Sequence, residues 1–231
     1  MLAQFFIIMS PPAASSGRRP GPPPALAALA LARVRPAAAR AADPPVIPAA
    51  EWVCPPAPDR ASLGVDFKTA PVPGPVIKCG TEALWNTTTS DGKNSMPTFY
   101  FPAADLNAVY TLIIVDRDMP NATSPALSPQ VQMALTWIPG FDIGVAPGFD
   151  VSDVETAVTL YQYHGPQPPA FSGCHRYYSI LYLQPDGSDP ALSPAERTQF
   201  DFPTWATKNK LVKKAENFWQ TQNAPHRTGP C

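Results

Sequence analysis

Two short polar motifs carry the side chains of this chain that could do chemistry. Asp116 and Asp118 follow an apolar run, and His175 and Tyr177 open another. Alternate residues of an extended chain point to the same face, so each pair can present both of its side chains together. A carboxylate beside a histidine fixes the tautomer of the ring, which leaves the second ring nitrogen and the tyrosine hydroxyl for a ligand. We therefore expect these four residues to form a small polar pocket at a sheet edge.

Three other interpretations of these residues compete with a ligand pocket. The first is a buried network of Asp, His and Tyr that satisfies only itself. The second is a catalytic triad with Ser172 or Cys174 as nucleophile. Both residues lie too close in sequence to His175 for the usual geometry, so we expect no catalysis. The third is a metal site built from His164, His175 and Asp118, which lacks a recognisable ligand spacing, so we expect neither a metal ion nor a cofactor.

Strands are the elements that must position these residues. Runs of Val, Ile, Thr and aromatic residues bounded by Gly, Pro, Asn or Asp are typical of strands. Helix signals come late in the chain: Ser193-Pro194-Ala195-Glu196 is a capping box, and Asp201 can cap a helix that runs to about Lys210. The strand candidates are residues 76–78, 98–101, 110–115, 133–138, 156–163 and 177–184.

Composition divides the chain of 231 residues into unequal parts. Residues 1–42 contain five arginines and no acidic residue, and residues 43–74 are rich in proline. We expect 1–42 to be a signal or transit segment outside the fold and 43–74 to be an irregular lead-in. The folded domain is then expected over 75–222, which is long enough to bury a core, followed by a polar tail over 223–231.

The charge balance argues against some classes of partner. The whole chain has 17 basic and 18 acidic residues, and without the five arginines of residues 1–42 the remainder has 12 and 18, a net charge of -6. Nucleic acids require a positive surface, so we expect no nucleic-acid binding. The apolar run at 25–32 is too short to span a bilayer, and we expect no stable membrane insertion.

The first 42 residues fit either of two targeting signals. Arg18-Arg19 precede a short apolar run, and Ala39-Arg40-Ala41 has the small-x-small form of a signal-peptidase site. These features predict secretion or entry into the secretory pathway. A mitochondrial or plastid transit peptide is also rich in arginine and free of acidic residues, so it remains the alternative.

Cysteines and glycosylation sequons favour the secretory interpretation. An even number of cysteines suits two disulfides in an oxidising compartment, with three possible connectivities. Asn86 and Asn121 each begin an Asn-x-Thr sequon in turn-like surroundings. The disulfide candidates are Cys54, Cys79, Cys174 and Cys231.

Taken together, the motifs resemble the phosphatidylethanolamine-binding protein family. Asp116-Arg117-Asp118-Met119-Pro120 resembles the family's Asp-Pro-Asp-Ala-Pro. Tyr163 to Pro169, then Gly173 to Tyr177, resemble its Tyr-x-Gly-Pro-x-Pro-Pro and Gly-x-His-Arg-Tyr motifs. The resemblance covers about residues 75–222 and implies a mainly β fold, in which a large antiparallel sheet packs on a smaller one, with peripheral C-terminal helices. The family's last helix and strand are resembled by Phe200-Asp201-Phe202, Trp205-Ala206 and Asn217-Phe218-Trp219.

The resemblance also implies a function in binding, without catalysis. Family members hold a small anion or a phosphorylated headgroup in a cavity at the sheet edge. Others inhibit a protease or a kinase, so a protein-interaction module with a degenerate cavity is the alternative. Gln132 stands where the family has a second histidine, and because glutamine carries no charge we expect a less electropositive and less pH-sensitive cavity. The implied ligand-binding residues are Asp116, Asp118, Gln132, Pro168, Pro169, Gly173, His175 and Tyr177.

Overall fold

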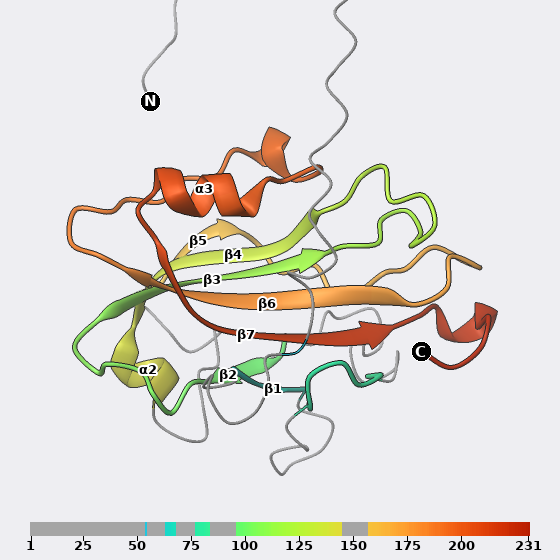
Figure 1. Cartoon of the computed structure of the whole chain (residues 1–231), viewed down its shortest axis with the longest axis horizontal. Coiled ribbons are helices and arrows are strands. Elements are labelled where there is room, and N and C mark those ends of the chain that lie inside the picture. Colours follow the sequence, from blue (N-terminus) through green and yellow to red (C-terminus); the bar gives the residue numbers. More distant parts are fainter. Residues whose placement is uncertain (1–53, 55–62, 68–76, 84–95, 145–156) are drawn as a thin grey trace, which may run out of the picture. The chain divides into compact units, whose positions relative to one another are not determined.

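The computed structural model describes residue 54 and residues 63–67, 77–83, 96–144 and 157–231. Two antiparallel sheets dominate this part of the chain (Figure 1), which confirms the expected mainly β fold with few helices. The larger sheet has the strand order β5-β4-β3-β6-β7, and the smaller one pairs β1 with β2. The strands are β1 Gly64–Asp66, β2 Thr98–Tyr100, β3 Val109–Asp116, β4 Gln130–Pro139, β5 Val158–Tyr161, β6 His175–Gln184 and β7 Val212–Thr221.

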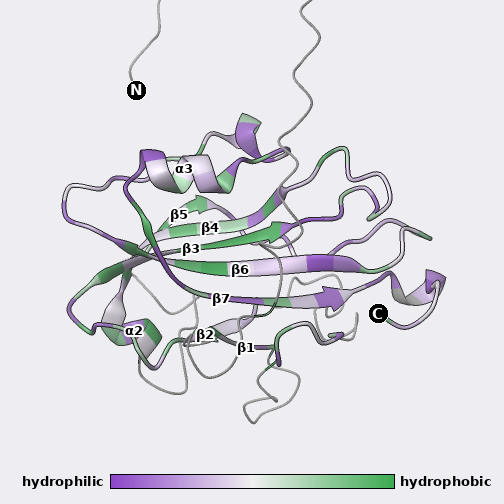
Figure 2. Ribbon diagram, viewed as in Figure 1, coloured by the Kyte–Doolittle hydropathy of each residue, from purple (hydrophilic) through white to green (hydrophobic). Residues whose placement is uncertain are grey.

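The central strand β3 is covered on both faces, as its nearly continuous apolar sequence predicts. Leu112 and Ile114 belong to a core cluster that also contains residues of the small sheet, such as Phe99. Ile113 and Val115 belong to a second cluster that contains Trp205. Alternate residues thus enter opposite layers, and Figure 2 shows the hydrophobic colouring along this strand. The chain leaves β3 at Asp116, where the polar site begins.

The helices are short and lie outside the sheets. Among the described residues they are α2 (Gly140–Gly144) and α3 (Phe202–Lys208), with 3-10 turns at Pro194–Glu196 and Ala224–His226. The predicted capping box at Ser193 and the predicted cap at Asp201 are both present. The helix α3 ends earlier than expected, and Lys210 beyond it has a positive φ of 58°. No helix of the described part is both long and apolar enough to cross a membrane.

Two segments differ from the sequence expectation. The segment 43–74 was expected to be irregular, yet it contains β1, around which Leu63, Val65 and Phe67 are all buried. Their spacing of two is the strand period, which the surrounding prolines obscure. The predicted strand at 76–78 is wrong for Ile77 and Lys78, because a turn held by Thr81 N–H and the Lys78 carbonyl (3.1 Å) begins there. Residue 76 lies outside the described residues.

Candidate functional site

Strand pairing brings the two polar motifs together at one end of the large sheet. The neighbouring strands β3 and β6 run antiparallel, and Asp116 lies directly opposite Tyr177. On the next strand, β7, Trp219 lies opposite Tyr177 and Thr221 lies opposite His175. Residues opposite each other on adjacent strands share a face of the sheet. This end of the inner face therefore gathers polar side chains from three strands.

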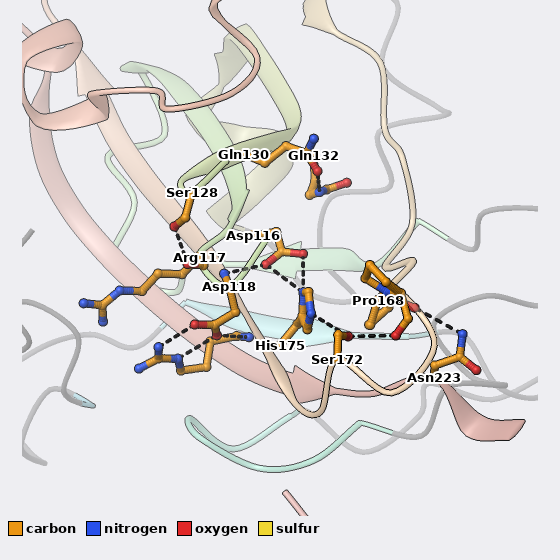
Figure 3. Close-up of polar contacts among 12 residues, drawn as sticks. Asp116, Arg117, Asp118, Ser128, Gln130, Gln132, Pro168, Ser172, His175 and Asn223 are labelled. Carbon is orange, nitrogen blue, oxygen red and sulfur yellow. Dashed lines mark hydrogen bonds and ion pairs between the residues drawn. The ribbon is translucent and has the colours of Figure 1, made fainter. Parts of the chain in front are cut away.

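A buried hydrogen-bonded contact between Asp116 and His175 lies at the centre of this group (Figure 3). The ring Nδ1 is 2.9 Å from Oδ2 and 3.2 Å from Oδ1 of the carboxylate. The backbone N–H of Asp118 also donates to Asp116 Oδ1 (2.8 Å). In the tautomer that donates Nδ1–H to the carboxylate, the ring presents Nε2 as a hydrogen-bond acceptor.

The Nε2 atom of His175 meets the hydroxyl of Ser172. The two atoms are 2.9 Å apart, and Ser172 Oγ is also 2.8 Å from the carbonyl oxygen of Pro169. Ser172 and His175 are only three residues apart, and this contact forms within one turn of the chain. Phe171 (φ 62°) and Gly173 (φ 80°) on either side of the serine both have left-handed backbone conformations, and this turn returns the serine to the histidine.

Asp118 forms an ion pair with a different residue, Arg176. Its buried carboxylate accepts three hydrogen bonds from that residue, from the backbone N–H (2.8 Å), Nε (2.8 Å) and Nη2 (2.6 Å). The side-chain hydrogen bond to Asp118 raises the pKa of the Arg176 guanidinium above its ordinary value. The charge of Asp118 is therefore balanced by a guanidinium group that sequence analysis had not assigned to the site.

Several buried donors surround the His175–Tyr177 pair. Burial, with the nearby Asp116 carboxylate, raises the pKa of Tyr177 well above its ordinary value, and Tyr163 lies close enough to contribute. Burial also raises the pKa of Tyr163. Three buried groups beside this pair have no hydrogen-bond partner among the described residues: the Tyr163 hydroxyl, the Trp219 indole N–H and the Thr221 hydroxyl.

The predicted Gln132 is buried beside this group and turned towards a neighbour. It lies at a register shift of β4, since Val131 pairs with Val115 and Met133 with Ile114. Its Nε2 donates to Gln130 Oε1 (3.2 Å), and Figure 3 shows the two glutamines together. One of the two amide N–H donors of Gln132 is thus engaged within the protein.

A cavity of about 800 Å³ lies on the Ser172 side of the histidine. Pro169 and Gly173, two of the predicted residues, line it together with Ser172 and Arg176. The predicted Asp116, Asp118, His175 and Tyr177 are buried behind this wall. Pro168 is also buried, and its carbonyl accepts a hydrogen bond from Asn223 Nδ2 (3.1 Å). The predicted residues therefore divide between a buried cluster and the wall of an open cavity.

The cysteines pair as Cys54–Cys79 and Cys174–Cys231, which resolves the connectivity left open by the sequence. The second bridge ties the expected polar tail to the residue before His175. Of the two sequons, Asn86 lies outside the described residues. Asn121 lines the cavity, and its Oδ1 accepts hydrogen bonds from Thr123 Oγ1 and the Ser124 N–H, both at 2.8 Å.

Sequence reasoning missed four members of this site for different reasons. Tyr163 and Arg176 stand inside the recognised motifs, and strand alternation could have assigned Tyr163 a role. Trp219 and Thr221 enter only through the pairing of β6 with β7, which no local pattern reveals. Among the described residues, no group of three His, Cys, Asp or Glu side chains could hold a metal ion.

Comparison with known proteins identifies relatives for most of the chain. A family model described as "Phosphatidylethanolamine-binding protein" matches residues 69–225. The carboxypeptidase Y inhibitor of Saccharomyces cerevisiae is 28% identical over 171 residues, which are 61% of this chain and 78% of that protein. A 26 kDa secreted antigen of Toxocara canis is 29% identical over 153 residues, which are 63% of this chain and 52% of the antigen. The chain therefore spans about half of this second relative.

A solved structure shares the fold. It is the carboxypeptidase Y inhibitor in complex with its cognate proteinase, with a TM-score of 0.54 and 22% sequence identity. The match covers 71% of this chain and 84% of that one. At this level of identity the match establishes the fold alone.

Proposed function

The chain belongs to the phosphatidylethanolamine-binding protein family, and on this premise we propose that it binds a small acceptor-rich group at the inner end of its large sheet. Candidate groups are phosphate, a carboxylate or a phosphorylated headgroup. The observation that carries the proposal is the set of three buried donors without partners, on Tyr163, Trp219 and Thr221. A buried donor left unpaired costs about 1–3 kcal/mol, which a ligand that supplies acceptors would recover.

The two carboxylates of the site do not oppose this proposal. Asp118 is balanced by Arg176, and Asp116 is engaged by His175 and by the backbone N–H of Asp118. Both carboxylates therefore hold donors in place, and Arg176 balances the charge of Asp118, whereas the hydrogen bonds to Asp116 stabilise its charge without cancelling it. Gln132 adds no positive charge, so recognition rests mainly on neutral donors. Binding of this kind requires no turnover.

Titration of the folded domain with phosphate, acetate and phosphoethanolamine, followed by NMR or calorimetry, tests the proposal. Tyr163→Phe removes one unpaired donor and keeps the ring, so we expect binding to weaken by about 5–10-fold, the equivalent of one hydrogen bond. Tyr100→Phe removes a hydroxyl in the small sheet and is the matched control. Absence of saturable binding, or equal binding by the two variants, would contradict the proposal.

A second candidate function is inhibition of a protease. It is supported by the similarity to carboxypeptidase Y inhibitor and by Phe171, which is 72% exposed at the rim of the cavity. Exposed aromatic residues often dominate protein interfaces. If Phe171 is such an anchor, Phe171→Ala should weaken inhibition of carboxypeptidase Y by about 30-fold, the equivalent of 2 kcal/mol. A chain that leaves the peptidase fully active at large molar excess would exclude this function for that enzyme.

The proposed location of the mature protein is outside the cell or in the secretory pathway. The two disulfides support an oxidising compartment, and one relative is named a secreted antigen. Mitochondrion and plastid remain the alternatives. On this view Asn121 carries a glycan at the cavity, and Asn86 carries another. Expression in a eukaryotic secretory host, with mass measurement before and after glycosidase, tests both sequons, and an unmodified secreted chain would contradict them.

A further inference from the structure

The contact between Ser172 and His175 supports an inference beyond ligand binding. We propose that Ser172 is a nucleophile that accepts an acyl group from small esters, with His175 as its general base and Asp116 as the positioning residue. The distances are those of a hydrogen-bonded relay: 2.9 Å from Ser172 Oγ to His175 Nε2, and 2.9 Å from His175 Nδ1 to Asp116 Oδ2. Nucleophile and base within about 2.6–3.2 Å, with the base oriented by a third group, is the signature of an activated serine.

The partners of the His175 ring determine which of its nitrogens carries the proton. Asp116 fixes the Nδ1–H tautomer of His175, so Nε2 carries a lone pair directed at the serine. The Ser172 hydroxyl has two acceptors within reach, Nε2 and the Pro169 carbonyl oxygen (2.8 Å). Rotation of the hydroxyl hydrogen from Pro169 to Nε2 prepares the serine for attack, and no heavy atom has to move.

The surroundings of Ser172 suit a small substrate. The serine lines the cavity of about 800 Å³, within the range of about 300–1,000 Å³ common for ligand sites. His175 and Asp116 are buried behind it, so bulk water does not compete for the contact between the ring Nδ1 and the carboxylate. Gly173 and Cys174 line the same cavity, and their backbone N–H groups are assigned to the oxyanion.

Three contacts hold the loop of residues 168–174 in this conformation. The Cys174–Cys231 disulfide lies next to His175, Asn223 donates to the Pro168 carbonyl, and the rings of Phe171 and His226 lie 4.6 Å apart. All three come from the segment 223–231, which sequence analysis treated as a polar tail. This segment therefore supports the turn that places the serine.

Transfer of the acyl group to the serine and its hydrolysis require no cofactor. Ser172 Oγ bonds to the carbonyl carbon of the ester while its proton passes to His175 Nε2. The tetrahedral intermediate expels the alcohol, which takes the proton from Nε2, and an acyl-serine remains. Water then attacks the acyl-serine, and His175 accepts the water proton and returns it to Ser172, which releases the carboxylic acid.

Reaction of the full folded chain with a fluorophosphonate probe, followed by peptide mass mapping, tests the proposal. We expect one adduct for each chain, on Ser172, and turnover of p-nitrophenyl acetate above the buffer rate. Ser172→Ala should lose both signals. Ser124→Ala, which removes an exposed hydroxyl outside the cavity wall, should keep both and is the matched control. Asp116→Asn should slow labelling by about 10²-fold or more, because the tautomer of His175 is no longer fixed.

Each outcome decides the proposal. Absence of an adduct on the wild-type chain, while a known serine esterase in the same tube is fully labelled, would overturn it. Equal labelling of Ser172→Ala and Ser124→Ala would overturn it as well. If thermal unfolding shows that Asp116→Asn is not folded, the comparison of the two serine variants still tests the proposal, because neither of them removes a charged group. Phosphate binding does not enter this test, so its result is separate from that of the proposed function.

Discussion

The contact between Asp118 and Arg176 should contribute strongly to stability. The Asp118→Ala variant removes all three hydrogen bonds that the buried carboxylate accepts. Hydrogen bonds to charged groups contribute about 1.5–3 kcal/mol each. The Arg176 side chain is 35% exposed, so the two bonds from its guanidinium are partly screened by solvent. The backbone N–H of Arg176, in contrast, loses its side-chain acceptor. We therefore expect a loss of about 3–4 kcal/mol, within the range for breaking a buried pair.

Urea denaturation under non-reducing conditions measures this loss, and thermal unfolding should show a decrease in melting temperature of about 8–12 °C for a domain of this size. The Arg227–Glu82 pair provides a matched control, because its side chains are 41% and 22% exposed. Arg227→Ala should cost less than about 1 kcal/mol. A cost of less than about 1 kcal/mol for Asp118→Ala, or equal urea midpoints for the two variants, would show that the buried pair adds little stability.

Three further outcomes are expected. Burial, and secondarily the charge of Arg197, lowers the pKa of His164, so its NMR titration should lie below the ordinary histidine range, and Arg197→Gln should restore only part of the shift. Burial raises the pKa of Tyr178 to about 12. In the unfolded chain this tyrosine ionises at a lower pH, so its contribution to stability should be lost as the pH rises from about 10 to about 12. A phenolate absorbance titration of Tyr178 with its midpoint near 10 would contradict this. Replacing both Cys174 and Cys231 by serine should lower the free energy of unfolding by about 2–4 kcal/mol, and an unchanged urea midpoint would show that the bridge adds no stability.

The order and type of most elements could be predicted from local patterns. The strands β3 and β6 are long apolar runs with polar ends, and their sequence alone indicates burial on both faces. The cap at Asp201 marks the start of α3 through a local hydrogen bond to Thr204 (3.1 Å). Such features depend on neighbours along the chain, so they can be predicted without knowledge of the tertiary structure.

Contacts made by turns and by distant segments could not be predicted in the same way. The approach of Ser172 to His175 depends on two left-handed positions that flank the serine, one of them at the non-glycine Phe171. The strand β1 is short and surrounded by prolines, and its core role appears only when the small sheet packs on the large one. Trp219 and Thr221 join the site because β7 returns beside β6 after α3. Each of these cases depends on tertiary packing, which local propensity does not encode.

A crystal structure of the domain grown with phosphate, and a second with phosphoethanolamine, would show whether the three buried donors hold a ligand. We predict an acceptor group within hydrogen-bond distance of the Tyr163 hydroxyl and of at least one of Trp219 Nε1 and Thr221 Oγ1, on the face that carries Asp116 and His175. A structure in which these donors contact only protein atoms, at ligand concentrations that saturate other phosphate-binding proteins, would contradict it.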